Sequence, residues 1–270
     1  MDVTAIIGIL LGLGLVLLGV VSTAGEGLHI GRVINFWSLQ ALLISLGGTA
    51  AALIIAFPSR TLLAVPRMIM KLIKPDNPDP REYIRDILDI AYASRKNGLL
   101  SLEAKTQECR DAFLKSGVML IVDSAGPDMI RDVMEGELDA MAERHRQGQD
   151  FFEKAGSYAP GFGILGTLIG LINALARTDD PALLTRHMAL ALIAAFYGAL
   201  LANVVFIPVA NKLKELSGQE QLCMRLVIEG VLAIQAGENP KQIQVRLLTF
   251  LPPRMRGSDD FRADQGDPAD

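Results

Sequence analysis

The chain has 270 residues, of which 50% are hydrophobic before its 25 glycines are counted, and its formal net charge is -4. This composition is more apolar than that of an ordinary soluble domain, and the negative charge gives no support to a nucleic-acid partner. The two cysteines, Cys109 and Cys223, and the three histidines are too dispersed for a disulfide framework or a metal site.

Four apolar runs without a charged residue predict four transmembrane helices. A helix needs ~20 mostly apolar residues to cross the hydrocarbon core of a bilayer. The runs are Val3–Val21, Phe36–Phe57, Ala155–Leu175 and Met188–Val209. The first run lacks the basic start of a secretory signal and is longer than the apolar part of one, so we interpret it as a retained helix.

The distribution of Lys and Arg predicts the orientation of these helices. Basic residues gather after the second run, before the third and after the fourth, whereas the short connections hold only Arg32, Arg177 and Arg186. Because Lys and Arg are enriched on the cytoplasmic side, both termini and residues 58–154 are expected in the cytoplasm. Both cysteines are then expected to be free thiols in a reducing compartment.

The cytoplasmic segment has helical periodicity. Its first apolar stripe comprises Ile84, Ile87, Leu88, Ala91 and Tyr92. Pro127 fits the first turn of a new helix, and no strong breaker except Pro160 follows before Leu175. The third span is therefore predicted to be the upper half of one long helix. Residues 210–250 are also predicted to be helical, with a break at Gly237–Pro240.

The resulting fold class is an all-α integral membrane protein with a helical cytoplasmic domain between spans 2 and 3. Transmembrane helices 1 and 2 are assigned to residues 1–57, and the cytoplasmic helical domain to residues 58–154. Transmembrane helices 3 and 4 are assigned to residues 155–209, and C-terminal cytoplasmic helices to residues 210–252. The charged tail of residues 253–270 is expected to be disordered.

The four runs contain no Asp, Glu, Lys, Arg or His. A proton path needs an ionisable group at membrane depth, so a conducting role would require a carboxylate from another chain. The alternative is that the helices only anchor the cytoplasmic part.

Two prolines favour a conducting role. Pro160 and Pro208 lie near the cytoplasmic ends of spans three and four, and each deprives the carbonyl four residues earlier, at Gly156 and Val204, of its helical donor. Water, a neighbouring helix or an ion can satisfy such a carbonyl. Thr167, two turns beyond Pro160, could add a hydroxyl to the same path. The alternatives are a plain helix kink and a back-bond from Thr167 to its own helix.

Pairs of glycines in the spans predict close helix packing. Gly8 with Gly12 and Gly166 with Gly170 form two G-x-x-x-G pairs, which allow neighbouring backbones to approach closely. This pattern favours an oligomer, but it is common in membrane helices.

Several longer motifs are more specific than these pairs. They include Arg144–Gly148 and the block Lys154–Leu171, which contains Ala159-Pro160-Gly161. Further motifs are Leu46–Thr49, Tyr197–Asn203 followed by Pro208, Glu229–Gly230 and Gly237–Pro240. Together these motifs resemble the MotA family of flagellar stator subunits, which includes the sodium-driven PomA. The resemblance covers roughly residues 5–252.

The resemblance implies an inner-membrane, multi-pass, non-enzymatic protein that needs no cofactor and forms a homo-oligomeric ring of five chains in lipid. The ring would surround the helices of a MotB-type dimer, whose single span carries the essential aspartate and whose periplasmic domain grips peptidoglycan. Transported H+ or Na+ would drive rotation against FliG of the rotor. Carried onto this chain, the family's residues are Arg95 and Glu103 at the rotor interface, Pro160 and Pro208 as hinge, and Thr167, Ala195 and Tyr197 along the ion pathway.

The choice of ion rests on two positions. Sodium-type members have a threonine at the place of Thr167 and another in span four, where this chain has Ala194 and Ala195. Because alanine cannot replace a hydration oxygen of sodium, protons are favoured, with sodium still open.

Other functions remain as alternatives. An ExbB/TolQ-type energiser has three spans, with one before the cytoplasmic domain, whereas two precede it here. A non-flagellar MotA-like motor or a non-conducting scaffold is also compatible with the spans. A secondary transporter is disfavoured because no internal repeat is evident, and an enzyme because no catalytic constellation is visible.

Overall fold

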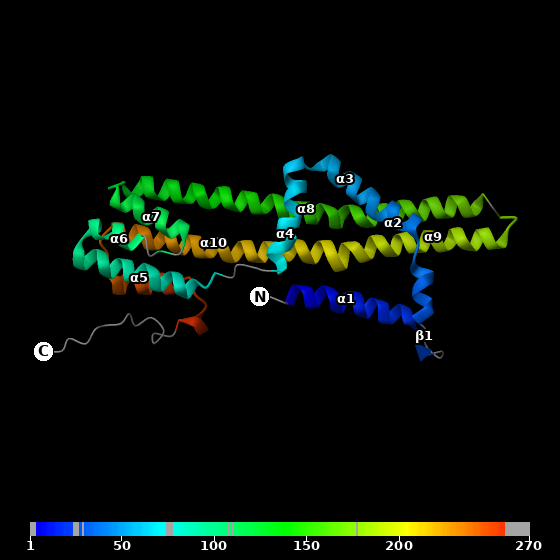
Figure 1. The fold of residues 1–270 in the computed structure, drawn as a ribbon, viewed down its shortest axis with the longest axis horizontal. Coiled ribbons are helices and arrows are strands. Elements are labelled where there is room, and N and C mark those ends of the chain that lie inside the picture. The colour runs from blue at the N-terminus through cyan, green and yellow to red at the C-terminus, as the bar shows by residue number, and fades with distance from the viewer. Residues whose placement is uncertain are drawn as a thin grey trace. The chain divides into compact units, whose positions relative to one another are not determined.

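The computed structural model describes residues 4–23, 27–28, 30–73, 78–106, 109, 111–176 and 178–256, and these are almost entirely helical (Figure 1). The strands β1, Ser22–Thr23, and β2, Gly27–Leu28, pair antiparallel and are two residues long. The chain divides into two compact units. The first combines residues 1–76 with 145–215, and the second combines residues 77–144 with 216–270.

The first unit contains the apolar helices. Its elements are α1 (Thr4–Val21), η1 (Ile30–Phe36), α2 (Leu39–Leu42), η2 (Leu43–Gly47), α3 (Gly48–Ala56), α4 (Ser59–Ile73), α9 (Pro181–Leu200) and η4 (Leu201–Phe206), with the second part of α8 (Pro127–Leu175) and the first part of α10 (Ile207–Gln235). Three described helical stretches are long and apolar enough to cross a bilayer: Leu39–Ala56 and parts of Pro127–Leu175 and Pro181–Gln235. The apolar stretch Ile7–Val21 of α1 is shorter.

The second unit has its own hydrophobic core. Its elements are α5 (Pro80–Asn97), η3 (Leu99–Ser101), α6 (Leu102–Thr106), α7 (Ala112–Val122), α11 (Pro240–Leu248) and η5 (Pro253–Met255), with the remaining parts of α8 and α10. The predicted stripe on α5 is buried in this core at Ile84, Ile87, Leu88 and Ala91. The prediction is wrong for Tyr92, which is 37% exposed. Tyr92 follows Ile84 by eight residues, which places its side chain about 80° around the helix from that of Ile84, at the edge of the stripe.

Local sequence explains where the helices start. Asp79, Asp180 and Asn239 each accept a backbone N–H with the side chain and precede a proline in the first turn of α5, α9 and α11. A polar N-cap followed by proline is a strong start signal, because the cap satisfies a free N–H and proline needs none.

The predicted long helix is confirmed: α8 begins at Pro127 and continues for 49 residues through Pro160. The predicted break is confirmed as well, because α10 ends at Gln235 and Gly237 has a φ of +69° before α11 begins. The units divide at other points than the predicted domains, since α4 groups with the first unit rather than with residues 58–154. Of the predicted disordered tail, residues 257–270 lie outside the described residues.

Candidate functional site

The centre of the first unit is a close crossing of α8 and α9 at glycines. A Cβ atom built on Gly198 would lie 2.6 Å from the carbonyl oxygen of Ala159 and 3.0 Å from the Cα of Gly163. A Cβ on Gly163 would in turn lie 3.3 Å from the Cα of Ala195. Because these neighbours are backbone atoms, only glycine allows the helices to come this near. The crossing therefore lies beside Pro160.

The glycine pairs named from the sequence occupy different surroundings. Gly166 lies against the side chain of Ala194, and a Cβ on Gly170 would be 2.8 Å from the carbonyl oxygen of His187. A Cβ on Gly12 would be 3.2 Å from Val204, whereas Gly8 has open space there. The packing role of Gly163 and Gly198 was not assigned from the sequence, although both fall within the family motifs quoted above.

The segments around the two prolines are neighbours. The carbonyl of Gly156 has no helical N–H donor, because the residue four positions later is Pro160. A Cβ on Gly156 would lie 2.7 Å from the side chain of Ile207. Ile207 immediately precedes Pro208, so the helix positions weakened by the two prolines pack side by side. Pro160 is half-buried and Pro208 is exposed.

The helix before Pro208 widens into a π-helix. Residues Leu201–Phe206 form η4, and the N–H of Ile207 donates to the carbonyl of Ala202 five residues earlier. Proline cannot donate to Val204, and the wider turn redistributes the hydrogen bonds that precede it. The sequence predicted the missing donor but not this widening. A second π-helix, η2, forms Leu43–Gly47 in the second span.

Three buried or half-buried hydroxyls bind backbone carbonyls between the apolar helices. Ser45 donates to the carbonyl of Ala194 at 2.9 Å, and Thr49 donates to that of Ser45 at 2.6 Å. The hydroxyl of Thr167 lies 3.1 Å from the carbonyl oxygens of both Gly163 and Ala191. The back-bond that was the alternative for Thr167 is therefore present, together with a contact to α9. No sequence pattern pointed to Ser45, whereas Thr49 belongs to the motif Leu46–Thr49.

Ala195 and Tyr197 lie near the same crossing. Ala195 is half-buried on α9 and faces Gly163. The hydroxyl of Tyr197 donates to the carbonyl of Phe36 and accepts from the N–H of Ser38 at 3.3 Å. The structure thus gives this hydroxyl an anchoring contact with the chain that enters the second span.

The two proposed rotor residues are both exposed in the second unit. Arg95 lies in the last turn of α5 and Glu103 in the first turn of α6. The intervening Gly98 has a φ of +81°, a conformation that favours glycine and ends α5. Among the residues that the structure describes, neither charge has an ion-pair partner, so both are accessible to another protein.

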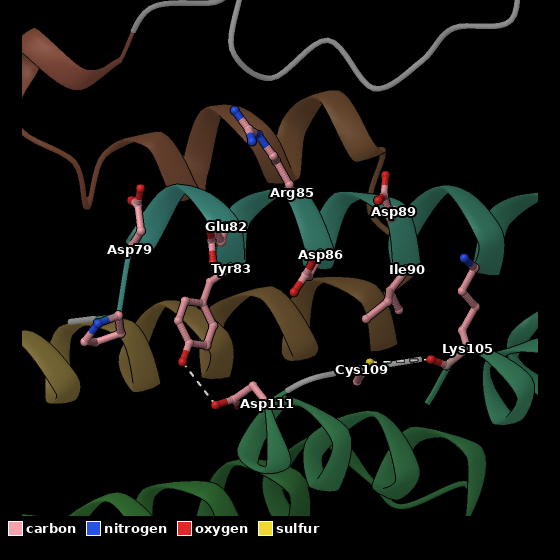
Figure 2. Close-up of a pocket in the computed structure, with 11 residues that line it drawn as sticks. Asp79, Glu82, Tyr83, Arg85, Asp86, Asp89, Ile90, Lys105, Cys109 and Asp111 are labelled. Carbon is pink, nitrogen blue, oxygen red and sulfur yellow. Dashed lines mark hydrogen bonds between the residues drawn. The ribbon is translucent and has the colours of Figure 1, made fainter. Parts of the chain in front are cut away.

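A second polar site lies in the same unit, between α5 and the start of α7. Figure 2 shows the Tyr83 ring pointing to Asp111, and its hydroxyl donates to that carboxylate at 3.0 Å. Asp111 also accepts the N–H of Leu114 and so caps α7. Burial and the neighbouring Asp111 raise the pKa of Tyr83 above its ordinary value. No pattern in the sequence had pointed to this pair of residues.

The cysteines show different surroundings. Cys223 is buried, and burial raises the pKa of its thiol to about 12, with Asp79 and Asp111 adding to the effect. Cys109 is half-buried on the wall of the Figure 2 pocket and donates to the carbonyl of Lys105 at 3.5 Å. Both are free thiols.

The four apolar runs contain no Asp, Glu, Lys, Arg or His. Among the described residues, no three His, Cys, Asp or Glu side chains are grouped so that they could hold a metal ion. What the first unit provides is a glycine-lined helix crossing, two prolines with neighbouring surroundings, and carbonyl-bound hydroxyls. This arrangement suits helices that pack tightly and flex at defined positions.

Comparison with known proteins gives a consistent result. The profile of the MotA/TolQ/ExbB proton channel family matches residues 105–225. Motility protein A of Bacillus subtilis is 38% identical, with 95% of this chain and 93% of the relative covered. Chemotaxis protein PomA of Vibrio alginolyticus is 34% identical, covering 93% of this chain and 96% of the relative. The solved flagellar MotAB stator complex from Bacillus subtilis contains a chain 37% identical, with a TM-score of 0.83, covering 93% of this chain and 97% of that one.

Proposed function

This chain belongs to the MotA/TolQ/ExbB proton channel family, and from that membership we propose that it is the ring-forming subunit of a flagellar stator. It is a stator subunit that uses ion flow to generate torque. The observation that carries this conclusion is the match to motility protein A, which extends over 95% of the chain and includes the segments around both prolines.

The proposal includes four membrane spans with both termini in the cytoplasm. The charge distribution supports this topology, because basic residues gather after the second apolar run, before the third and after the fourth. Three long apolar helical stretches support spans two to four. The first span is supported by the charge-free run Val3–Val21, which forms the helix α1 from Thr4 to Val21 and contains the apolar stretch Ile7–Val21.

A partner chain supplies the ion-binding carboxylate. The four apolar runs contain no Asp, Glu, Lys, Arg or His, and proton transfer at membrane depth requires a group of this kind. The similar chain of the solved stator is part of a MotAB complex, which supports a MotB-type partner here. In the proposed assembly, five copies of this chain surround two partner helices. The crossing beside Pro160 faces the partner's aspartate, and its flexing accompanies binding and release of the ion.

Protons are the proposed coupling ion. Each of the three hydroxyls described between the spans is engaged with a carbonyl. Ala194 and Ala195 add no side-chain oxygen at the position where sodium-type relatives have one. A sodium ion requires several oxygens to replace its hydration shell, whereas a proton requires only the titrating carboxylate. No cofactor is proposed.

The rotor contact is assigned to Arg95 and Glu103. Both charges are exposed at the end of α5 and the beginning of α6, and exposed charges contribute little to the stability of their own fold. Complementary charges on a partner instead steer association and fix its register. The proposed partner is FliG of the rotor.

The test is swimming of a flagellated host that lacks its own stators. This gene and its candidate MotB-type partner gene are supplied separately and together. Rotation only with both supports the proposal, and rotation that persists in sodium-free medium supports protons. Paralysed filaments despite a stable purified complex would contradict a flagellar role and favour an ExbB/TolQ-like energiser, once a chimeric cytoplasmic domain has excluded mismatch with the rotor.

A further inference from the structure

An apolar groove of about 1070 Å³ lies in the first unit between α1, α3, α4, α8, η4 and α10. Its walls include Ile9, Leu53, Ile69 and Phe152, and its few polar lining groups include Lys212 and Glu215 of α10. This volume slightly exceeds the usual range of about 300–1,000 Å³ for small-molecule pockets. The groove is therefore large enough for a chain-like apolar ligand.

The position of the groove along the spans identifies the kind of ligand. Ile9 lies near the start of the first apolar run, Leu53 near the end of the second, and Phe152 just before the third. In the proposed topology these are all cytoplasmic ends. The groove then opens at the depth of the acyl chains of the cytoplasmic leaflet, where its apolar wall is in contact with lipid.

The helix α4 has three distinct faces around this groove. Val65, Ile69 and Leu72 line the groove from one face. Leu63 and Met70 form a second, apolar face that is 79% and 62% exposed. The basic face, by which we mean Arg60, Arg67 and Lys71, is exposed and lies opposite the groove. Residues 59–73 contain no acidic side chain.

This division is the pattern of a helix that lies in the plane of a membrane surface. Figure 1 shows α4 running across the direction of α9, which belongs to the same unit. Such a helix buries its apolar faces among acyl chains and extends its basic side chains among headgroups. Anionic lipids of the cytoplasmic leaflet attract basic residues at this depth.

We propose that α4 and the groove form a binding site for an anionic phospholipid of the cytoplasmic leaflet. An acyl chain occupies the groove, and the basic face holds the phosphate-bearing headgroups beneath it. The charge of the basic face favours this occupant, because residues 59–73 present three exposed basic side chains and no acid, and a lipid phosphate supplies the complementary negative charge. The proposal goes beyond torque generation and rests only on the cytoplasmic placement of α4.

The test is lipid retention by the purified complex of this chain with its partner, measured by native mass spectrometry. The delipidated complex is titrated with phosphatidylglycerol or phosphatidylcholine of identical acyl chains. Phosphatidylglycerol is expected to bind more tightly. The variant Arg60→Gln/Arg67→Gln/Lys71→Gln should lose this preference, by about fivefold per basic side chain and about 100-fold in total.

Two further variants make the outcome decisive. Lys96→Gln/Lys115→Gln/Lys241→Gln removes the same charge from exposed positions of the second unit and should bind as the unaltered complex does. Ile69→Trp fills the groove and should weaken both lipids while preserving the oligomer. Equal binding of the two lipids, or equal losses in both triple variants, would overturn the proposal. An Ile69→Trp complex that retains lipid but loses subunits would assign the groove to a second copy. Swimming is not a readout here, so the result is independent of the rotor proposal.

Discussion

The helix crossing at Gly198 provides the most direct test of the packing. In Gly198→Ala, the new methyl group would lie 2.6 Å from the carbonyl oxygen of Ala159 and 3.0 Å from the Cα of Gly163. Optimal separations between nonbonded carbon atoms are ~3.5–4.0 Å. Both obstacles are backbone atoms, which no side-chain rotation can move. The helices α8 and α9 must therefore separate by about 0.5–1 Å.

The size of the effect follows from two opposing terms. Separation by this distance loses about a quarter to a half of the dispersion energy of the contacts involved, and overpacking of this kind costs about 1–3 kcal/mol. The replacement of glycine by alanine in a helix recovers about 0.5–1 kcal/mol. Overpacking exceeds this gain, so we expect a net loss of about 1–2 kcal/mol. For a chain of this size the thermal midpoint should fall by roughly 2–8 °C.

The assay is thermal unfolding of the purified chain in one detergent, followed by circular dichroism. Gly161→Ala is the matched control, because Gly161 lies in the same part of α8, is exposed and has no heavy atom within 4 Å of its Cβ position. The control should be neutral or slightly more stable, from helix propensity alone. If Gly198→Ala and Gly161→Ala unfold at the same temperature, the helices are not in the close contact described here.

Four other changes have defined expected outcomes. Pro160→Leu should leave expression unchanged but abolish torque, because it restores the helical hydrogen bond that proline removes. Charge reversal of Arg95 or Glu103 should impair rotation while the complex still assembles. Tyr83→Phe should destabilise the second unit by about 1 kcal/mol, seen as a lower thermal midpoint, because it deletes the hydrogen bond to a carboxylate. The folded state keeps the Cys223 thiol neutral, because its pKa is raised to about 12. The contribution of this thiol to stability is therefore complete below pH 9 and is lost as the pH rises toward about 12. The thermal midpoints at pH 8 and pH 10.5 should differ less in Cys223→Ala than in the unaltered chain.

Three of these changes have a control or a companion measurement in the same chain. Gly161→Ala tests whether any substitution beside Pro160 stops the motor. Lys115→Glu reverses an exposed charge outside the proposed rotor contact, and its rotation should be normal. Maleimide at neutral pH should label the half-buried Cys109 before the buried Cys223, and equal labelling would contradict the burial described. Normal torque in Pro160→Leu would exclude the hinge, and normal rotation after both reversals would exclude the rotor assignment.

Several features of the fold could be predicted from the sequence because one strong local signal decides each of them. The N-terminal start of α8 at Pro127 and the break around Gly237 follow from proline and glycine chemistry and were predicted correctly. The buried face of α5 followed from periodicity, with an error only at Tyr92, where the stripe meets solvent. Three of the four apolar runs correspond to helical stretches long and apolar enough to cross a bilayer, and these were predictable because the bilayer thickness sets their minimum length.

The contacts between segments far apart in the chain could not be predicted from the sequence. The crossing partner of Gly163 could not be identified from one chain, because G-x-x-x-G patterns do not name their partner helix. The π-helices η2 and η4 have no characteristic composition that would predict them, and Pro208 explains only η4. The Tyr83–Asp111 bond joins residues 28 positions apart through an otherwise ordinary pair of polar side chains. The grouping of α4 with the apolar helices depends on tertiary packing rather than on hydropathy.

The second unit is assembled from two stretches of chain that leave the ribosome at different times. Pro78, before α5, and Cys223, on α10, are in contact although 145 residues separate them. At ~5–20 residues per second, synthesis of the intervening chain takes on the order of ten seconds. During that interval the apolar face of α5, including Ile84 and Ile87, lacks the partner surface that α10 will provide. In the proposed topology, the third and fourth spans enter the bilayer before the cytoplasmic core can close. A delay in their insertion would then prolong the exposure of this half-formed apolar core to chaperones and proteases.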